Sequence, residues 1–356
     1  MKRMSGIARS LTTAVAILGA IVIAATSSAI ADRFTRSPNA RASHAASGHY
    51  KRPPTGINQW FWELSTRPGL GHLPPVSGSY PAPGSANIWD TDLFNDSNTH
   101  GIPTGPSPVV RALHAAGKYS ICYIEAGAYQ TTFPDRRNFA PADYGYGRRR
   151  YGYPGYSNEW WFNVAGFAHY VPGRPRTLTG AAINIAAGLQ KRIAWCRLEG
   201  QDALEPDDME GYTNPGDTGV PGGGWHLTRA DDLGFERWLA YEAHRHGLAI
   251  FQKNDPADAR IDAGFYDGMI SEECNRYRDP CAGPHGDGTP YLRAGKPVLN
   301  AEYVEDGERT SSFCAADIAA GISGALFDLA LDGRVYKPCA PPTLTALRLR
   351  SSGAGG

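Results

Sequence analysis

The stretch from Ala181 to Asp207, AAINIAAGLQKRIAWCRLEGQDALEPD, decides the fold of this chain. Residues 181–199 follow a helical pattern, and Gly200 supplies the left-handed cap at which many helices end. The short apolar run at 202–206 then has the length of a buried strand. A helix, a glycine and a strand in this order indicate a right-handed βαβ unit, whose strands run parallel.

The same alternation recurs along the chain. Helical patterns also cover Pro108–Ala116 and Thr228–His246, which end at Gly117 and Gly247. Short aromatic and aliphatic runs, the predicted strands, lie at 57–64, 86–93, 119–126, 160–165, 202–206, 248–253, 266–271, 297–303 and 322–329. Such an alternation predicts an α/β fold, a (β/α)₈ TIM barrel in a single catalytic domain. One of the nine runs must then be an added strand or a misread loop.

The N-terminal residues 1–31 predict a secretory signal peptide. Three basic residues precede an apolar run from Leu11 to Ala25, and Ala29–Ala31 has the small-residue pattern of a cleavage site. The apolar run is shorter than the roughly 20 residues of a membrane span. We therefore expect a secreted, extracellular protein without membrane attachment after cleavage; a retained N-terminal anchor is the alternative.

Beyond residue 31 the composition divides the chain further. Residues 32–55 are polar and rich in Pro, Ser and Ala, which predicts a flexible lead-in. The barrel domain is expected at 56–345, and a disordered tail at 346–356.

Cysteine usage fits an exported chain, because an even number of cysteines there predicts disulfides. All six follow the predicted signal peptide: Cys122, Cys196, Cys274, Cys281, Cys314 and Cys339. Cys274–Cys281 and Cys314–Cys339 are the preferred bridges because each closes a local, loop-rich segment. The other two cysteines either pair or remain buried thiols.

Net charge narrows the choice of partner. The chain has 35 basic and 35 acidic residues, and residues 1–31 hold three of the basic ones and none of the acidic ones, so the mature chain carries a formal charge of −3. This balance argues against nucleic acid as a partner. Eight Trp and 18 Tyr could provide stacking surfaces for sugar rings, although core packing is the simpler explanation for any one of them.

Carboxylates are concentrated at predicted strand ends. The segment 202–212 alone holds five of them: Asp202, Glu205, Asp207, Asp208 and Glu210. Other strand ends supply Glu63, Asp90, Asp92, Tyr123, Glu125, Lys253, Asn254, Glu272, Glu273, Glu302 and Tyr303. In a TIM barrel such residues meet at one mouth, which favours a carboxylate-based hydrolase. A solvated acidic loop, a calcium site or isolated salt bridges are the alternatives.

A series of motifs, in order, resembles a known family. The motifs are WFWEL, IWDTDLF, LHAAGKYSICYIEAG, DALEPDDMEGYTN, FQKN, SEECNRY and LNAEY, from about Trp60 to Tyr303. Together they resemble the endo-α-1,4-polygalactosaminidases, glycoside hydrolase family 114. The resemblance implies a TIM barrel that hydrolyses α-1,4-linked galactosamine polymers without a metal or another cofactor.

The resemblance carries over residue by residue. The family's acidic pattern falls on Asp202, Glu205, Pro206, Asp207, Gly211 and Tyr212; its other pairs fall on Lys253 and Asn254, Glu272 and Cys274, and Glu302 and Tyr303. Departures from the family pattern occur at Glu63, Gln130, Asn163, Asp208 and Glu210. These departures put the substrate specificity in question more than the chemistry.

Glycoside hydrolysis needs two carboxyl groups. We predict Asp207 as the nucleophile and Glu272 as the general acid/base, with Glu205 as a further catalytic candidate and Asp202 as a structural residue. The predicted substrate-binding residues are Asp90, Asp92, Tyr123, Lys253, Asn254, Glu302, Tyr303 and Trp60. The carboxylates among them would suit an ammonium-bearing, cationic polysaccharide.

Two alternatives from other classes remain at this point. The barrel could bind carbohydrate without cleaving it, since Gln130 and Asn163 depart from the family pattern. It could also be another hydrolase that uses Asp207, Asp208 and Glu210 as oxygen ligands of a metal ion.

Overall fold

The computed structural model describes residues 49–65, 86–94, 101–277, 281–283 and 286–339. The predicted signal peptide, the tail at 346–356 and most of the predicted lead-in lie outside these residues. No helix in the described part of the chain is long and apolar enough to cross a membrane.

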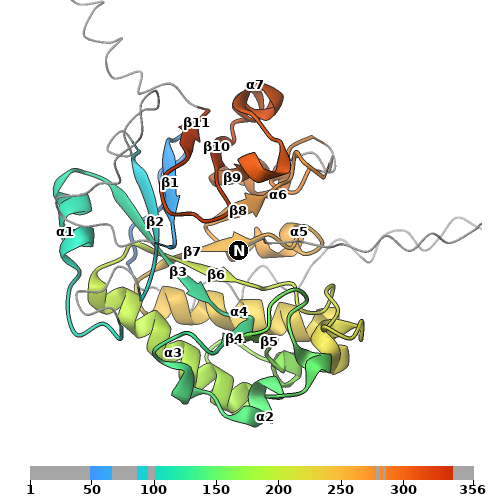
Figure 1. Cartoon of the computed structure of the whole chain (residues 1–356). Helices are drawn as coiled ribbons and strands as arrows, with labels where there is room; N and C mark the ends of the chain where they lie inside the picture. The colour runs from blue at the N-terminus through green and yellow to red at the C-terminus, as the bar shows by residue number, and fades with distance from the viewer. Residues whose placement is uncertain (1–48, 66–85, 95–100, 278–280, 284–285, 340–356) are drawn as a thin grey trace, which may run out of the picture.

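Eight parallel strands form the central sheet of the molecule (Figure 1). In spatial order they are β1 (Trp60–Glu63), β2 (Ile88–Asp92), β3 (Tyr119–Glu125), β6 (Ala203–Asp207), β7 (Ala249–Lys253), β8 (Gly268–Glu272), β9 (Val298–Tyr303) and β10 (Ser323–Phe327). Nearly every residue in these strands is buried, as expected of a parallel sheet covered on both faces. The predicted TIM-barrel class is confirmed.

The two ends of the sheet meet without a complete ladder. A ninth strand, β11 (Tyr336–Pro338), pairs antiparallel with β10. Aromatic rings then join the two ends: Trp60 packs 5.3 Å from Phe327, and Phe61 packs 5.1 Å from Tyr336. Just beyond the strands, the N–H groups of Leu64 and Ser65 donate to the carbonyl oxygen of Leu331. The barrel is therefore nearly closed, without a strand ladder at the seam.

Helices connect the strands and cover the outside of the barrel (Figure 1). They are α1 (Pro108–Ala115), α2 (Pro141–Tyr144), α3 (Ala182–Glu199), α4 (Arg229–Arg245), α5 (Ala259–Asp262), α6 (Thr289–Arg293) and α7 (Thr310–Ala320). The three predicted helices correspond to α1, α3 and α4, with ends that differ by one residue. Gly200 adopts the expected left-handed conformation, with φ of 95°.

The run predicted as a strand at 160–165 is the one that does not enter the barrel. Its first residues belong to β5 (Glu159–Trp161), which pairs antiparallel with β4 (Ala128–Gln130). This small sheet lies in the long connection between β3 and β6. The ninth run is therefore an added strand, one of the two outcomes expected.

The described residues form three disulfides, two of which tie a helix to the sheet or to the segment next to it. Cys122–Cys196 joins β3 to α3, Cys314–Cys339 joins α7 to the segment after β11, and Cys274–Cys281 closes the loop after β8. Both preferred pairings are confirmed, and the two remaining cysteines pair as well.

The N-terminal ends of the strands are held by residues 49–54. Lys51 Nζ lies 2.8 Å from Asp202 Oδ2, and Tyr50 donates a hydrogen bond of 2.7 Å to Asp267. Asp202 also accepts a hydrogen bond of 3.0 Å from the backbone N–H of Ser120. Asp202 thus anchors its strand at the base of the barrel, as a structural residue.

Candidate active site

One buried lysine stands at the centre of the candidate site. Lys253, the last residue of β7, has no exposed surface, and its Nζ lies 2.7 Å from Asp207 Oδ1 and 2.7 Å from Glu272 Oε2. Glu205 Oε1 is 4.0 Å from the same nitrogen. The ammonium also lies 5.1 Å from the centre of the Trp62 ring. Residues from β1, β6, β7 and β8 thus converge on one positive charge.

Strand geometry explains this convergence. Successive side chains of a strand point to opposite faces, so Glu205 and Asp207 share the inner face of β6. Lys253 and Glu272 occupy the same inner face at the ends of β7 and β8. Because parallel strands end at one edge of the barrel, these four side chains meet at its C-terminal mouth.

Hydrogen-bond donors fix both carboxylates. Tyr123 on β3 donates a hydrogen bond of 2.8 Å to Asp207 Oδ2, and the hydroxyl of Tyr303 on β9 donates to Glu272 Oε1. Asn254 donates to Glu272 Oε2 at 3.1 Å and accepts from the Glu272 backbone N–H at 2.8 Å. Each carboxylate therefore has one tyrosine partner and shares Lys253.

Electrostatics keep Lys253 charged. Burial acts to lower the pKa of its ammonium, but the carboxylates of Asp207, Glu272 and Glu205 outweigh burial and raise the pKa well above its usual value. A permanently protonated lysine is unsuited to forming a Schiff base. Its chemistry here is that of a fixed positive charge.

Behind Lys253 lies a pair of fully buried acids, Asp90 on β2 and Glu205 on β6. Burial raises the pKa of Asp90 to about 7, and burial followed by the neighbouring charge of Asp90 raises the pKa of Glu205 well above its usual value. None of the four oxygens of this pair has a hydrogen-bond partner among the described residues, so burial and mutual repulsion favour the neutral carboxyl form. A carboxyl group that is neutral and has no exposed surface is poorly placed to attack a sugar.

A second group of acids lies beside Asp207. Glu125 at the end of β3, Glu159 on β5 and Asp208 place carboxylate oxygens within 4.8 Å of one another. Gln130 bridges two of them: its side-chain N–H groups donate hydrogen bonds of 3.3 Å to Glu125 Oε2 and 3.1 Å to Glu159 Oε1. Burial first, and then the charge of Glu159, raises the pKa of Glu125 well above its usual value.

Glu159 was missed by the sequence reasoning, because only the antiparallel pairing of β4 with β5 brings it opposite Gln130.

Close backbone contact joins the group of Glu125, Glu159 and Asp208 to the site. The N–H groups of Ala126 and Gly127 donate to the carbonyl oxygen of Asp207, at 3.2 and 3.0 Å. A Cβ atom on Gly127 would lie 1.6 Å from the carbonyl oxygen of Asp208, so this position requires glycine.

Comparison with known proteins identifies the family. A model of glycoside-hydrolase family GH114 matches residues 39–340, most of the chain. The chain belongs to this family. It is therefore a glycosidase, and its substrate is a carbohydrate.

Solved structures resemble this GH114 enzyme at low sequence identity. Ega3 of Aspergillus fumigatus, in a crystal structure with galactosamine, is 22% identical with a TM-score of 0.59, over 80% of this chain and 96% of that one. The glycoside hydrolase domain of PelA from Pseudomonas aeruginosa is 16% identical with a TM-score of 0.46, over 78% of this chain and 97% of that one. The likeness to Ega3 supports the barrel fold. No curated protein sequence matches significantly.

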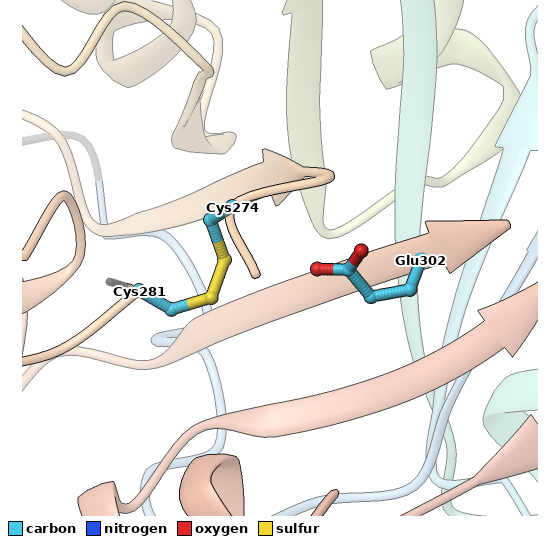
Figure 2. A group of neighbouring side chains, drawn as sticks. All are labelled: Cys274, Cys281 and Glu302. Atoms are coloured by element: carbon cyan, nitrogen blue, oxygen red, sulfur yellow. A yellow bond between two sulfur atoms is a disulfide. The ribbon is translucent and has the colours of Figure 1, made fainter. Parts of the chain in front are cut away.

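Glu302 and Trp60, two of the predicted substrate-binding residues of the GH114 enzyme, do not face the mouth of the barrel. Glu302 precedes Tyr303, whose side chain faces the site, so Glu302 faces the helix layer. Figure 2 shows its carboxylate directed toward the Cys274–Cys281 disulfide. It accepts a hydrogen bond of 2.9 Å from the Asn275 N–H, and burial raises its pKa to about 7.

Trp60 is likewise a core residue, with no exposed surface and a ring 5.7 Å from that of Trp62. We therefore do not retain Glu302 or Trp60 among the proposed substrate-binding residues. Asp92 stays at the mouth, 7% exposed, and accepts a hydrogen bond of 2.8 Å from the N–H of Phe94.

Two Gly/Pro/Tyr-rich inserts of the GH114 chain, around residues 145–155 and 215–224, pack against each other. Tyr151 stacks on Trp225 at 3.7 Å, and the N–H of Asp217 donates to the carbonyl oxygen of Gly152 at 2.7 Å. In the first insert Tyr146 is 59% exposed and lies 5.6 Å from the Trp160 ring. These inserts thus bring aromatic faces to the side of the barrel that carries β4 and β5.

The metal-dependent alternative receives little support from this geometry. In the described part of the chain, the groups of side chains that are close enough to share an ion do not combine Asp207, Asp208 and Glu210. Both oxygens of Asp207 already have partners, in Lys253 and Tyr123. One of the three groups contains Cys274 and Cys281, whose sulfur atoms are bonded to each other (Figure 2) and cannot ligate as thiolates.

Proposed function

We propose that this protein is a secreted glycosidase that cleaves α-1,4-linked, galactosamine-containing polysaccharide with retention of anomeric configuration. Asp207 is the nucleophile and Glu272 the general acid/base. The observation that carries this proposal is the contact of both carboxylates with the ammonium of Lys253.

This contact limits the separation of the two carboxylates. Each oxygen lies 2.7 Å from Nζ of Lys253, so the two oxygens are at most twice that distance apart, about 5.4 Å. Retaining glycosidases hold their two carboxyl groups about 5–5.5 Å apart, whereas inverting enzymes leave about 6.5–9.5 Å for a water molecule. The two oxygens that contact Lys253 therefore lie closer together than the inverting range, which supports the retaining mechanism.

The two steps use the residues as follows. An oxygen of Asp207 attacks C1 of the sugar while Glu272 gives its proton to the leaving glycosidic oxygen, and the C1–O bond breaks. Water then attacks C1, Glu272 takes the proton of that water, and the bond between C1 and Asp207 breaks. The free sugar leaves, and both carboxyl groups return to their starting state.

Lys253 suits this cycle because the negative charge moves between its two partners. The first step requires an ionised Asp207 and a protonated Glu272, and in the glycosyl-enzyme Glu272 is ionised and Asp207 is esterified. One fixed ammonium in contact with both oxygens stabilises whichever carboxylate is charged, without moving. Tyr123 and Tyr303 hold the two carboxylates in position during the exchange.

The acidic surroundings support a cationic substrate. Glu125, Glu159 and Asp208 gather beside the nucleophile, and a sugar with a free amino group presents an ammonium that such carboxylates bind well. The crystal structure of Ega3 with galactosamine points to the same class of sugar. We propose that Asp92, Asn254 and these acids line the sugar-binding site, whereas Asp90, which has no exposed surface, lies behind it beside Glu205.

Secretion and domain limits belong to the same proposal. Three disulfides fit an oxidising compartment, as the predicted signal peptide at 1–31 requires. Because Tyr50 and Lys51 contact the base of the barrel, we place the start of the folded domain before residue 50 rather than at 56.

The decisive experiment measures new reducing ends from a de-N-acetylated α-1,4-galactosamine oligomer. The wild-type chain is compared with Asp207→Asn and Glu272→Gln, each verified as folded by circular dichroism. Loss of each group is expected to lower kcat about 10²–10⁴-fold or more. The surface substitution Asp217→Asn is the matched control.

Wild-type rates in both site variants would contradict the mechanism. Binding of the polymer without new ends in the wild type would favour a carbohydrate-binding barrel over the proposed hydrolysis. Cleavage of a fully N-acetylated oligomer at the same rate would contradict the proposed preference for a cationic sugar.

A further inference from the structure

A second cluster of buried acids lies outside the catalytic mouth. Asp255, Asp258 and Asp262 follow β7 and reach into α5, and each is 0–1% exposed. Glu236, from the neighbouring helix α4, is also fully buried and extends into the same space. Acids from two separate elements therefore share one enclosed volume.

Most oxygens of this cluster have no hydrogen-bond donor among the described residues. Both carboxylate oxygens of Glu236, Asp255 and Asp262 are buried without a hydrogen-bond partner among the described residues. Arg229 forms its ion pair with Asp258 and is half exposed, and the charge of Arg237 also acts on Asp262. Six unpartnered carboxylate oxygens in a water-excluded space carry a large desolvation cost, which a bound cation would offset.

The oxygens of this cluster are close enough to share one ion. One oxygen from each of Glu236, Asp255 and Asp262 lies within 4.8 Å of the others. A purely carboxylate ligand set also suits a hard cation rather than zinc or copper.

We propose that Glu236, Asp255 and Asp262 bind one hard divalent cation, with calcium as the probe, and that this ion fastens the segment after β7 to α4. Asp255 follows Asn254 directly, and Asn254 positions Glu272 through two hydrogen bonds. Gln252 in turn donates to the carbonyl oxygens of Asn254 and Asp255, at 3.0 and 2.8 Å. The ion therefore acts on stability first and on the catalytic acid through the backbone, without touching the substrate.

The test uses full-length protein stripped with EDTA and dialysed, with metal content measured by mass spectrometry. Calcium chloride is then titrated while the Tm is followed by calorimetry and the Kd by isothermal titration. We expect the Tm to rise by several degrees and to saturate at one ion per chain. Terbium should displace calcium and luminesce on tyrosine excitation, because Tyr266 contacts the backbone of Glu236.

Asp262→Asn and Glu236→Gln provide the site variants, and Asp217→Asn in the exposed insert is the control. Each site variant should weaken the Kd at least tenfold and lose most of the calcium-dependent Tm shift, and the control should keep both. Neutral amides reduce repulsion within the cluster, so both variants are expected to fold.

Metal-free wild-type protein alone is also a sufficient test of the proposed cation site. If millimolar calcium neither binds nor raises its Tm, the acids share protons instead and the proposal is wrong. An equal calcium response in the site variants would overturn it as well. Neither result bears on hydrolysis, which the reducing-end assay measures separately.

Discussion

Asp207 and Glu272 each hold one carboxylate oxygen 2.7 Å from the same nitrogen atom, Nζ of Lys253. The two acids come from strands β6 and β8, and the strand between them supplies the cation. A single charge thus links the two groups whose ionisation must alternate during hydrolysis.

Replacing the central cation should shift the pH dependence as well as the rate. For Lys253→Met we expect kcat to fall about 10²-fold or more, because the developing charge loses its fixed partner. Both limbs of the kcat/KM profile should move to higher pH, since carboxylates without a nearby cation are harder to ionise. Lys253→Arg keeps the charge and should keep the positions of the limbs; an unchanged profile in Lys253→Met would show that the ammonium does not act on the acids.

The stereochemistry of the product tests the retaining mechanism. Proton NMR of the first reducing ends released should show the α-anomer before mutarotation. With an activated α-glycoside, azide should rescue Glu272→Ala to give the α-glycosyl azide and Asp207→Ala to give the β-glycosyl azide. The opposite pattern would exchange the two roles, and an initial β-anomer from the wild type would contradict the retaining mechanism.

Substitutions of Tyr303 and Glu302, adjacent residues on β9, should affect catalysis differently. Tyr303→Phe removes a hydrogen bond to a carboxylate, an interaction worth about 1.5–3 kcal/mol, so kcat should fall about 10–100-fold. Glu302→Gln, on the opposite face of the same strand, should leave kcat/KM within about twofold. Steady-state kinetics on a galactosamine oligomer measure both, and a larger loss for Glu302→Gln would return Glu302 to the binding site.

The buried acid pair should make stability depend on pH. Burial raises the pKa of Asp90 from 3.8 to about 7, so the folded chain keeps a proton that the unfolded chain loses near pH 4. The stability that this group contributes is complete below pH 4 and is lost as the pH rises toward 7, by up to about 1.4 kcal/mol per pH unit. In Asp90→Asn the free energy of unfolding should therefore fall less between pH 5 and pH 8. Urea titrations at pH 5 and pH 8 measure this free energy. An equal fall in the wild type and in Asp90→Asn would refute a buried proton at Asp90.

Much of the fold follows from patterns that the sequence displays openly. Glycines after α1, α3 and α4 mark the helix ends, and the apolar runs between helices have the length of barrel strands. The run at 160–165 was harder to place, because a short aromatic strand has the same pattern in a barrel and in a two-stranded sheet. Its partner Ala128–Gln130 follows β3 too closely to be recognised as a separate strand.

For the candidate site, the sequence predicts some residues and not others. Strand ends bring Asp207, Lys253 and Glu272 together, as the pattern of polar residues suggested. The sequence could not say which of two adjacent polar residues faces the mouth, and in the Glu302–Tyr303 pair it is the tyrosine. Glu159 reaches the site only through a hairpin in a long connection, a placement that no local pattern records. The catalytic roles themselves remain predictions.

The attachment of Tyr50 and Lys51 beneath the barrel has a practical consequence for recombinant work. A truncation that begins at residue 56 would strip Asp202 and Asp267 of these two partners, at the feet of β6 and β8, the strands that carry both proposed catalytic acids. Cloning boundaries should therefore lie upstream of residue 49. A shorter fragment would lack the contacts of Tyr50 and Lys51 and could be judged inactive for that reason alone.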